Sequence, residues 1–275
     1  MIEPGTVVRH DFAIRTLTVI ETHRLSPGLV RVTLGGDELA GFTSVGPTDH
    51  SKLFFPDPVT GEIVAPRVTA DGLTRPEFGT VIVRDYTTRA FRNGHGDAES
   101  QLDFDFVLHQ DGGPASAWAA AAAPGDTLVV GGPRGSRMPP SGVKRFVLAA
   151  DETALPALAR WIEILPDDVE IVAFCELSNE SDAAYLEPTH VQRARIIWLK
   201  KGEGALERAI RSLGELDADT FVWAAGEAES LVPIRRYLRR ELGLSAAQVK
   251  IDGYWKQGEA GRDHHAPIDP SDPED

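Results

Sequence analysis

Residues 83–91, with the sequence VRDYTTRAF, combine side chains that bind anions, stack on rings and donate hydrogen bonds. Arg84 and Arg89 carry planar guanidinium groups, which bind phosphates through paired, charge-assisted hydrogen bonds. Tyr86 offers a flat amphipathic ring, and Thr87 offers a hydroxyl group. Arg89 shares a face with Thr87 if the strand is regular. Taken alone, the stretch is better explained as a solvated strand end. The other motifs determine whether it is interpreted as a ligand-binding strand instead.

A second group of candidate residues lies at 109–120, with the sequence HQDGGPASAWAA. Gly113 and Pro114 precede an alanine-rich segment for which we predict a helix. Free N–H groups at a helix start bind phosphate, and Ser116 adds a hydroxyl group. His109 ends the preceding strand, where a ligand contact and an ordinary polar side chain are both open interpretations.

The first half of the chain has the pattern of a small antiparallel barrel. Short apolar or alternating segments are separated by Gly and Pro turns, and residues 102–110 alternate strictly with period two. We predict six strands and one helix. The strands are 13–22, 29–36, 52–57, 79–87, 102–110 and 126–136, and the helix is 116–123.

The second half changes to continuous apolar strands separated by helical periodicity, as in the spacing of Leu155, Leu158 and Ile162. This alternation predicts an α/β doubly wound parallel sheet. The predicted strands are 144–150, 169–175, 194–199, 219–226 and 248–255. Thr153 stands where it can cap the first helix of this half.

We therefore predict an α+β protein of two domains, at residues 1–137 and 138–258, joined by the Gly- and Pro-rich stretch 131–142. Residues 259–275 contain six acids, one arginine and three prolines, so we predict a disordered acidic tail. Its adjacent His264 and His265 lack a third fixed ligand, so no metal site is predicted.

Composition excludes several classes of protein. The net charge is −14, which argues against binding nucleic acid or anionic lipid surfaces. One cysteine, Cys175, permits neither an internal disulfide nor a four-cysteine iron–sulfur cluster. No apolar run is long enough to span a bilayer, and the N-terminal stretch has no secretory signal pattern. We expect a cytoplasmic protein without an integral membrane segment.

Five motifs in order resemble the siderophore-interacting protein family, whose members are FAD-dependent ferric-siderophore reductases of the ferredoxin–NADP reductase superfamily. The motifs are RDYTTR (84–89), HQDGGPASAWA (109–119), GGPRGS (131–136), AADETALPAL (149–158) and GYWKQG (253–258). The resemblance extends from about residue 13 to about residue 258. It implies an FAD-binding barrel followed by a domain of the NAD(P)H-binding type.

The resemblance also implies roles for single residues. Arg84 would pair with the FAD pyrophosphate, Tyr86 would pack on the isoalloxazine, and Thr87 would bond near flavin N5. The other cofactor-binding residues that it implies are Asp85, Arg89, His109, Gly113, Pro114, Ala115, Ser116 and Thr153. The turn at 109–116 is slightly longer than the usual family spacing, which leaves the phosphate-binding N–H groups unassigned.

The turn at 149–158 carries Asp151 and Glu152, where dinucleotide-binding turns of the superfamily usually carry glycines. The acids suit a helix N-terminus but repel pyrophosphate. We therefore expect weak NADPH or NADH binding, or an electron-transfer protein such as ferredoxin as donor. Gly226 in a later strand–helix turn would admit the nicotinamide end.

The resemblance places Lys52, Arg134 and Lys256 around the open side of the flavin, where cations would attract an anionic ferric siderophore. Sequence spacing equally allows three scattered surface cations. The hypothesis is FAD-dependent reduction of a ferric siderophore by NAD(P)H, with no proton-transfer residue required. The alternatives are a general NAD(P)H–flavin or ferric reductase and a non-catalytic siderophore-binding iron carrier.

Overall fold

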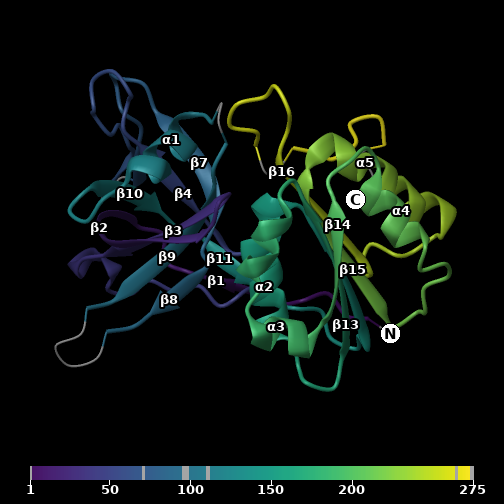
Figure 1. Cartoon of the computed structure of the whole chain (residues 1–275). Helices are drawn as coiled ribbons and strands as arrows, with labels where there is room; N and C mark the ends of the chain where they lie inside the picture. The colour runs from purple at the N-terminus through teal and green to yellow at the C-terminus, as the bar shows by residue number, and fades with distance from the viewer. Residues whose placement is uncertain (1, 70–71, 95–98, 110–111, 264–265, 273–275) are drawn as a thin grey trace. The chain divides into compact units, whose positions relative to one another are not determined.

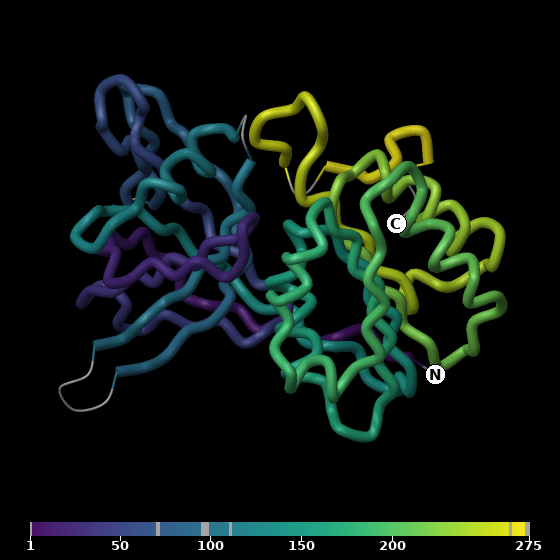
Figure 2. Tube along the Cα trace, in the orientation of Figure 1, coloured from purple at the N-terminus to yellow at the C-terminus, as the bar shows by residue number. Residues whose placement is uncertain are grey.

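The computed structural model describes residues 2–69, 72–94, 99–109, 112–263 and 266–272, which form two compact units. The first unit runs from Val7 to Arg137, and the second combines the residues up to Thr6 with those from Met138 onward (Figure 1). The purple tube in Figure 2 therefore belongs to the second unit only as far as Thr6, and from Val7 onward it belongs to the first. Gln110, His264 and His265 lie outside the described residues.

The first unit is built on an antiparallel sheet of seven strands in the order β7-β4-β10-β2-β3-β9-β8. The antiparallel arrangement agrees with the prediction. The predicted count of six omits β8, because three residues are too short to show a period. In chain order the strands are β2 (Ile14–Ser26), β3 (Leu29–Gly35), β4 (His50–Phe55), β7 (Ile82–Thr87), β8 (Ala90–Arg92), β9 (Gln101–Val107) and β10 (Thr127–Gly131).

Two small strand pairs and two helices complete this unit. They are β1 (Val7–Arg9) with β11 (Gly135–Arg137), β5 (Arg67–Thr69) with β6 (Gly72–Thr74), η1 (Asp37–Leu39) and α1 (Pro114–Ala121). The stretch 131–142 is therefore not a linker throughout, because β11 pairs with β1 in the first unit. Ser141 forms a bridge with Glu3 in the second.

Two residues join the opposite edges of the large sheet. β7 and β8 are its outer strands, yet only Thr88 and Arg89 separate them in the chain. Two intervening residues bridge at most about 11 Å, so the sheet must curl until its edges approach. The backbone N–H of Thr88 donates to Asp49 O, and that of Arg89 donates to Asp103 O, both at 2.9 Å. We call the buried segment Thr87–Arg89 the closing corner.

Acidic residues on β9 are buried together with their partners. Asp103 and Asp105 are 2% and 4% exposed, although period two places them on the polar face. Arg92 lies 2.6 Å from Asp103, and Arg31 forms hydrogen bonds of 2.7 and 2.8 Å with Asp105. A buried carboxylate requires such a partner, so the polar face of β9 is covered by ion pairs rather than by water.

The second unit contains a parallel five-stranded sheet in the order β14-β13-β12-β15-β16. All five strands were predicted as parallel. They are β12 (Arg145–Ala150), β13 (Glu170–Leu177), β14 (Arg195–Lys200), β15 (Thr220–Glu227) and β16 (Val249–Trp255). The helices are η2 (Glu152–Ala154), α2 (Leu155–Ile164), η3 (Glu180–Tyr185), α3 (Pro188–Arg193), α4 (Ala205–Arg211), α5 (Ala228–Arg236) and η4 (Tyr237–Glu241).

Both faces of this sheet are covered, which explains the continuous apolar strands. Alternate residues of β12 and β15 pack against α4 and α5, as Val147 and Val222 do. Their neighbours Phe146 and Phe221 pack on Trp161 of α2, with ring centroids 5.9 Å from the Trp161 ring in each case. A strand that is buried on both faces has no reason to alternate.

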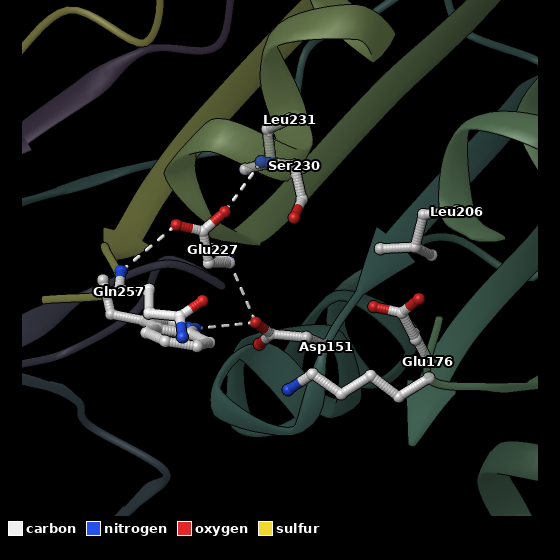
Figure 3. A pocket seen from close by; sticks show the side chains of 9 residues that line it. Asp151, Glu176, Leu206, Glu227, Ser230, Leu231 and Gln257 are labelled. Carbon is white, nitrogen blue, oxygen red and sulfur yellow. Dashed lines mark hydrogen bonds between the residues drawn. The ribbon is translucent and has the colours of Figure 1, made fainter. Parts of the chain in front are cut away.

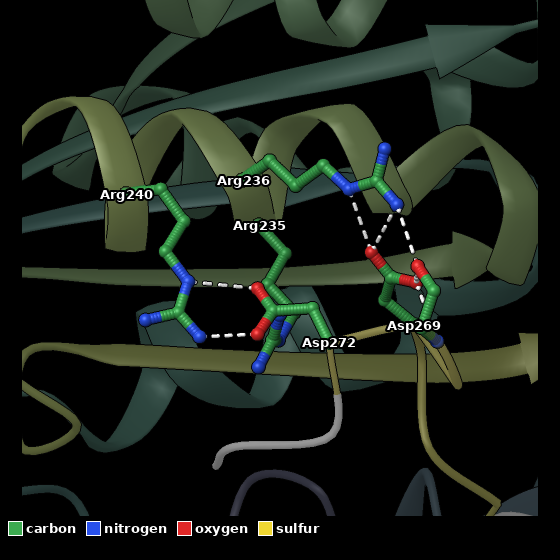
Figure 4. A network of polar contacts seen from close by, with 6 residues as sticks. Arg235, Arg236, Arg240, Asp269 and Asp272 are labelled. Carbon is green, nitrogen blue, oxygen red and sulfur yellow. Dashed lines mark hydrogen bonds and ion pairs between the residues drawn. The ribbon is translucent and has the colours of Figure 1, made fainter.

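The acidic segment 266–272 differs from the predicted disordered tail, because it packs against α5 and η4 (Figure 4). Ile268 is 7% exposed and joins the core of the second unit. Asp269 lies 2.6 Å from Arg236, and Asp272 pairs with Arg235 at 3.0 Å and also with Arg240. Composition alone does not predict this packing, because the low average hydrophobicity of the segment does not reveal that Ile268 is buried and that arginines elsewhere in the chain pair with its aspartates.

Replacing both carboxylates, as in Asp269→Asn/Asp272→Asn, should lower the thermal unfolding midpoint near neutral pH. Hydrogen bonds from Ser271 and Arg236 lower the pKa of Asp269, and those from Arg240 and Arg235 lower the pKa of Asp272. Both groups thus stabilise the fold above their unfolded pKa of about 3.9, and this contribution is lost as the pH falls.

The measurement is the thermal unfolding midpoint of parent and variant from about pH 7 down to about pH 3. The difference between the two midpoints should become smaller as the pH falls. Asp217→Asn, which alters an exposed carboxylate, serves as the control. An equal difference at both ends of the pH range would contradict this account of the segment.

Candidate functional site

Strand β7 and the closing corner carry the first group of candidate residues. Tyr86 packs into the core, with its ring centroid 4.4 Å from that of Phe106 and 6.2 Å from that of Phe55. Burial raises the pKa of the Tyr86 phenol above its ordinary value, so the phenol stays neutral at physiological pH. Thr87 ends the strand and is 7% exposed.

The two arginines of this stretch have different surroundings. Arg84 is half-buried, and its Nη1 donates to Val83 O at 2.7 Å. Among the described residues, none of the ion pairs involves Arg84. Arg89 is 8% exposed and lies beyond the end of the strand at Thr87, so the condition of a regular strand through Arg89 is not met. Arg84 is the better placed of the two to bind an anion.

The turn before α1 is closed by its own hydrogen bonds. Ser116 Oγ accepts from His109 N–H at 3.2 Å, and His109 O accepts from Gly112 N–H at 3.1 Å. A Cβ at Gly112 would lie 2.5 Å from Ser116 Oγ, so this close approach requires glycine. Gly113 caps α1, and Pro114 starts it, as a proline in the first helical turn should. The His109 side chain is exposed.

A shared aromatic cluster joins this turn to β7. Trp118 of α1 packs on Phe55 and Phe106, with ring centroids 5.6 and 5.9 Å apart, and Tyr86 contacts the same two rings. Trp118 therefore has a packing role. The cluster anchors the start of α1 and strand β7 on one core, so the fold brings these two candidate groups together.

The three predicted substrate cations are not equivalent. Lys52 lies 3.0 Å from Asp85, another predicted ligand residue, and Lys256 lies 3.0 Å from Glu229. The exposed Arg134 forms no ion pair with any residue that the structure describes, and its guanidinium lies 4.6 Å from the centre of the Phe12 ring. Lys52 and Arg134 belong to the first unit, whereas Lys256 belongs to the second.

The second unit has a pocket of about 120 Å³ at the carboxyl ends of its parallel strands (Figure 3). Ligands bind at this edge in open α/β sheets. Three of its lining side chains are carboxylates and one is a lysine. The lining residues are Asp151, Glu176, Lys201, Leu206, Glu227, Ser230, Leu231, Trp255 and Gln257.

Asp151 holds the first strand–helix turn together. Its Oδ1 accepts from Thr153 N–H at 2.9 Å and from Thr153 Oγ1 at 2.6 Å, so Asp151 rather than Thr153 caps this turn. Its Oδ2 accepts from Glu227 N–H at 3.0 Å and from Trp255 Nε1 at 2.8 Å. The carboxylate thus accepts hydrogen bonds from the ends of two strands, β15 and β16.

Gly226 faces this carboxylate rather than an open space. Its φ is 148°, and a Cβ there would lie 2.6 Å from Asp151 Oδ2. The structure therefore explains this glycine by the close approach of Asp151. The room predicted above Gly226 for a nicotinamide ring is taken by a side chain of the protein itself.

The pKa values of three acids in and beside this pocket are shifted by their surroundings. Burial raises the pKa of Asp151, which hydrogen bonds from Thr153 and Trp255 partly oppose, and burial also raises the pKa of Glu176. Burial likewise opposes ionisation of Glu152, but the hydrogen bond from Ser178 and the charge of Lys201 lower its pKa overall. Lys201 lies 3.5 Å from Glu152 and 5.3 Å from the centre of the Trp255 ring.

Sequence reasoning missed Glu176 and gave no role to Trp255. The available signal was their position, because both stand at or near the carboxyl end of a strand in the parallel sheet. Among the described residues, no group of three or more His, Cys, Asp or Glu side chains is arranged to hold a metal ion. Within the same residues, each helix is too short or too polar to cross a lipid bilayer.

Glu176→Gln should raise the unfolding midpoint at about pH 8 and have little effect at about pH 4. Burial raises the pKa of Glu176, so folding favours the protonated carboxyl, and that stability is lost as pH rises through the folded pKa. Glutamine removes the charge but keeps an oxygen to accept from Gly202 N–H. Exposed Glu203→Gln is the control, and a variant that is destabilised at about pH 8 would refute the argument.

Comparisons with known proteins cover both units. Residues 18–137 match the siderophore-interacting FAD-binding domain, and residues 143–258 match the siderophore-interacting protein domain. The chain is 36% identical to the NADPH-dependent ferric-chelate reductase of Escherichia coli, over 90% of this chain and 95% of that one. It is 30% identical to the ferric vibriobactin reductase ViuB of Vibrio cholerae, over 91% and 92%.

Solved structures agree with these matches. A siderophore utilization protein from T. fusca superposes with a TM-score of 0.85 at 41% identity, covering 95% of this chain and 99% of that one. A ferredoxin NADP+ reductase from Neisseria gonorrhoeae has the same fold, with a TM-score of 0.59 at 15% identity and 88% and 99% coverage. The chain belongs to the siderophore-interacting protein family, which has the two-domain fold of the ferredoxin–NADP reductases.

Proposed function

We propose that this protein is an FAD-dependent reductase of ferric siderophores that takes its electrons from NADPH or NADH. The observation that carries the proposal is strand β7, which carries Arg84, Tyr86 and Thr87 and shares an aromatic cluster with α1. The relatives named as ferric-chelate and ferric vibriobactin reductases support this assignment, since each aligns along nearly its whole length.

The residues of the first unit fit FAD. Arg84 offers a guanidinium that no acid of the described residues neutralises, and a pyrophosphate is the anion that such a group binds best. Tyr86 is fixed by Phe106 and presents an aromatic surface, while Thr87 supplies a hydroxyl at the end of the strand. Gly113, Pro114, Ala115 and Ser116 form the first turn of α1, where backbone N–H groups favour phosphate.

Other predicted ligand residues fit less directly. Asp85 is paired with Lys52, and Arg89 lies buried at the corner. Thr153 belongs to the second unit and gives its N–H and its hydroxyl to Asp151. We therefore expect Arg84, Tyr86, Thr87 and the start of α1 to contribute most to FAD affinity.

The second unit offers a poorer site for a nicotinamide dinucleotide. Asp151 already accepts from Thr153 and Glu227 N–H groups, which a glycine-rich turn would leave for pyrophosphate. Lys201 is the single cation among the lining residues of the pocket. The proposal therefore includes weak NADPH or NADH binding, and an electron-transfer protein such as ferredoxin is the alternative donor.

The chemistry follows from iron. Iron(III) is held tightly by hard oxygen ligands, and iron(II) is held less well, so reduction loosens the complex. A bound flavin would supply the conversion between the two-electron hydride of a nicotinamide and the single electron that each iron(III) takes. The protein's part is to orient the cofactor, to attract an anionic chelate through Arg134 and to keep Tyr86 neutral beside the site. No residue is asked to move a proton.

One observation favours a second candidate function. Because the protein's own Asp151 occupies the turn where a dinucleotide would bind, a non-catalytic siderophore-binding iron carrier is also compatible with this site. In either role Cys175 is inert, since it is buried and burial raises the pKa of its thiol. The proposed location is the cytoplasm.

The purified protein should be yellow, should bleach anaerobically with NADPH or NADH, and should recolour when a ferric siderophore is added. If reduced ferredoxin bleaches the flavin and neither nicotinamide does, the electron donor is a protein and not NADPH or NADH. If none of these donors reduces the flavin, the result favours the non-catalytic iron carrier. A colourless protein that binds no added FAD would reject the proposal. The measurement is the visible absorbance spectrum after each addition.

Arg84→Ala should weaken FAD binding by roughly ten- to a hundredfold, the range for losing hydrogen bonds to a charged group. The control is Arg67→Ala, which removes an exposed arginine from β5 of the same unit. Titration of the apoprotein with FAD, followed by quenching of flavin fluorescence, measures both affinities. Equal affinities of the two variants would refute the role of Arg84.

A further inference from the structure

The loop that carries Arg134, between β10 and β11, is held by backbone hydrogen bonds to two other residues. Gly132 N–H donates to Ala13 O, and His10 N–H donates to Arg134 O, both at 3.0 Å. The Arg134 side chain itself is exposed, and its guanidinium rests over the Phe12 ring at 4.6 Å from the centroid. A free arginine samples many rotamers, so this ring contact restricts where the charge lies.

Ser136, two residues further on, is fully buried and uses all of its hydrogen-bonding capacity. Its Oγ donates to Asp49 Oδ2 in a very short contact and accepts from Val45 N–H at 3.1 Å. The remaining partner is His10 Nε2 at 2.7 Å. A hydroxyl has one hydrogen and two lone pairs, so this network assigns the His10 proton to Nε2.

Asp49 connects this loop to the closing corner. Its carboxylate, on a residue that is 3% exposed, accepts from Ser44 Oγ at 3.0 Å and Gly46 N–H at 2.9 Å, in addition to Ser136. Its backbone oxygen accepts from Thr88 N–H at 2.9 Å. One buried residue thus bonds both the strand end that carries Tyr86 and Thr87 and the loop that carries Arg134.

We infer that Ser136 and Phe12 are positioning residues for Arg134, whose loop Asp49 connects to the residue after strand β7. The inference rests on the proposed function, because it assumes that Arg134 meets an anionic ferric complex. Every residue involved belongs to the first unit. An electron would pass efficiently from the flavin only to a bound and oriented ferric complex, so a fixed cation serves the reaction better than a mobile one.

The test compares Ser136→Ala and Phe12→Leu with Arg134→Ala in the FAD-loaded protein. The probes are iron(III) tris(catecholate), which carries three negative charges, and the neutral iron(III) tris(acetohydroxamate). Anaerobic binding without a donor is measured by fluorescence quenching, and reduction then gives kcat and KM. Each positioning variant should weaken binding of the trianion roughly three- to tenfold, raise its KM equally and leave the neutral complex unchanged.

A double variant separates positioning from general damage. If Ser136 acts through Arg134, Ser136→Ala/Arg134→Ala should bind the trianion no more weakly than Arg134→Ala alone. Ser26→Ala, which removes another buried hydroxyl of the same unit, is the matched control. Phe12→Leu keeps apolar volume, so it tests the same point should Ser136→Ala fail to fold.

The failures are distinguishable. If Arg134→Ala binds the trianion as the parent does, the proposed substrate site is wrong. If Arg134→Ala weakens binding but Ser136→Ala and Phe12→Leu behave like Ser26→Ala, the positioning inference is wrong. It is also wrong if Ser136→Ala weakens both complexes equally or adds to the effect of Arg134→Ala.

Discussion

The first unit depends on one constraint, the two-residue connection between the outer strands of its sheet. Because Thr88 and Arg89 link β7 to β8, the edges must come together, and the residues at the join are buried and hydrogen-bonded to β9 and to the start of β4. The chemistry-bearing stretch 84–89 is therefore also the closure of the barrel. The residues proposed to bind the cofactor therefore lie at or next to the point where the sheet closes.

The two units differ in the groups that they leave available to an anion. In the first, buried carboxylates accept from other arginines and hydroxyls, as Asp105 does from Arg31 and Asp49 does from Ser136, and Arg84 and Arg134 form no ion pair with the described residues. In the second, Asp151 takes N–H groups at the edge where a dinucleotide would bind. The proposed flavin site is thus the better prepared of the two sites for an anion.

Much of this arrangement could be predicted from the sequence, because its signals are local. Continuous apolar runs identified all five parallel strands, and the alternation of residues 102–110 identified β9. β8 was missed because three residues show no period, and the packed segment 266–272 was missed because its stability comes from arginines about 30 residues earlier in the chain. The roles of Asp49, Ser136 and Glu176 depend on partners distant in sequence, which spacing does not reveal.

The first unit is one continuous stretch of the sequence, and it is inserted between the two segments that form the second unit. Ile2 is buried and Glu3 pairs with Ser141, so the first few residues of the chain find their partners only after residue 138 has been added. During synthesis the seven-stranded sheet can be completed as soon as β10 emerges, while the first few residues still lack their partners. A chain cut after Arg137 would keep every strand of the seven-stranded sheet, but its residues up to Thr6 would have lost their partners. The part from Met138 onward would lack the N-terminal residues that pack on it.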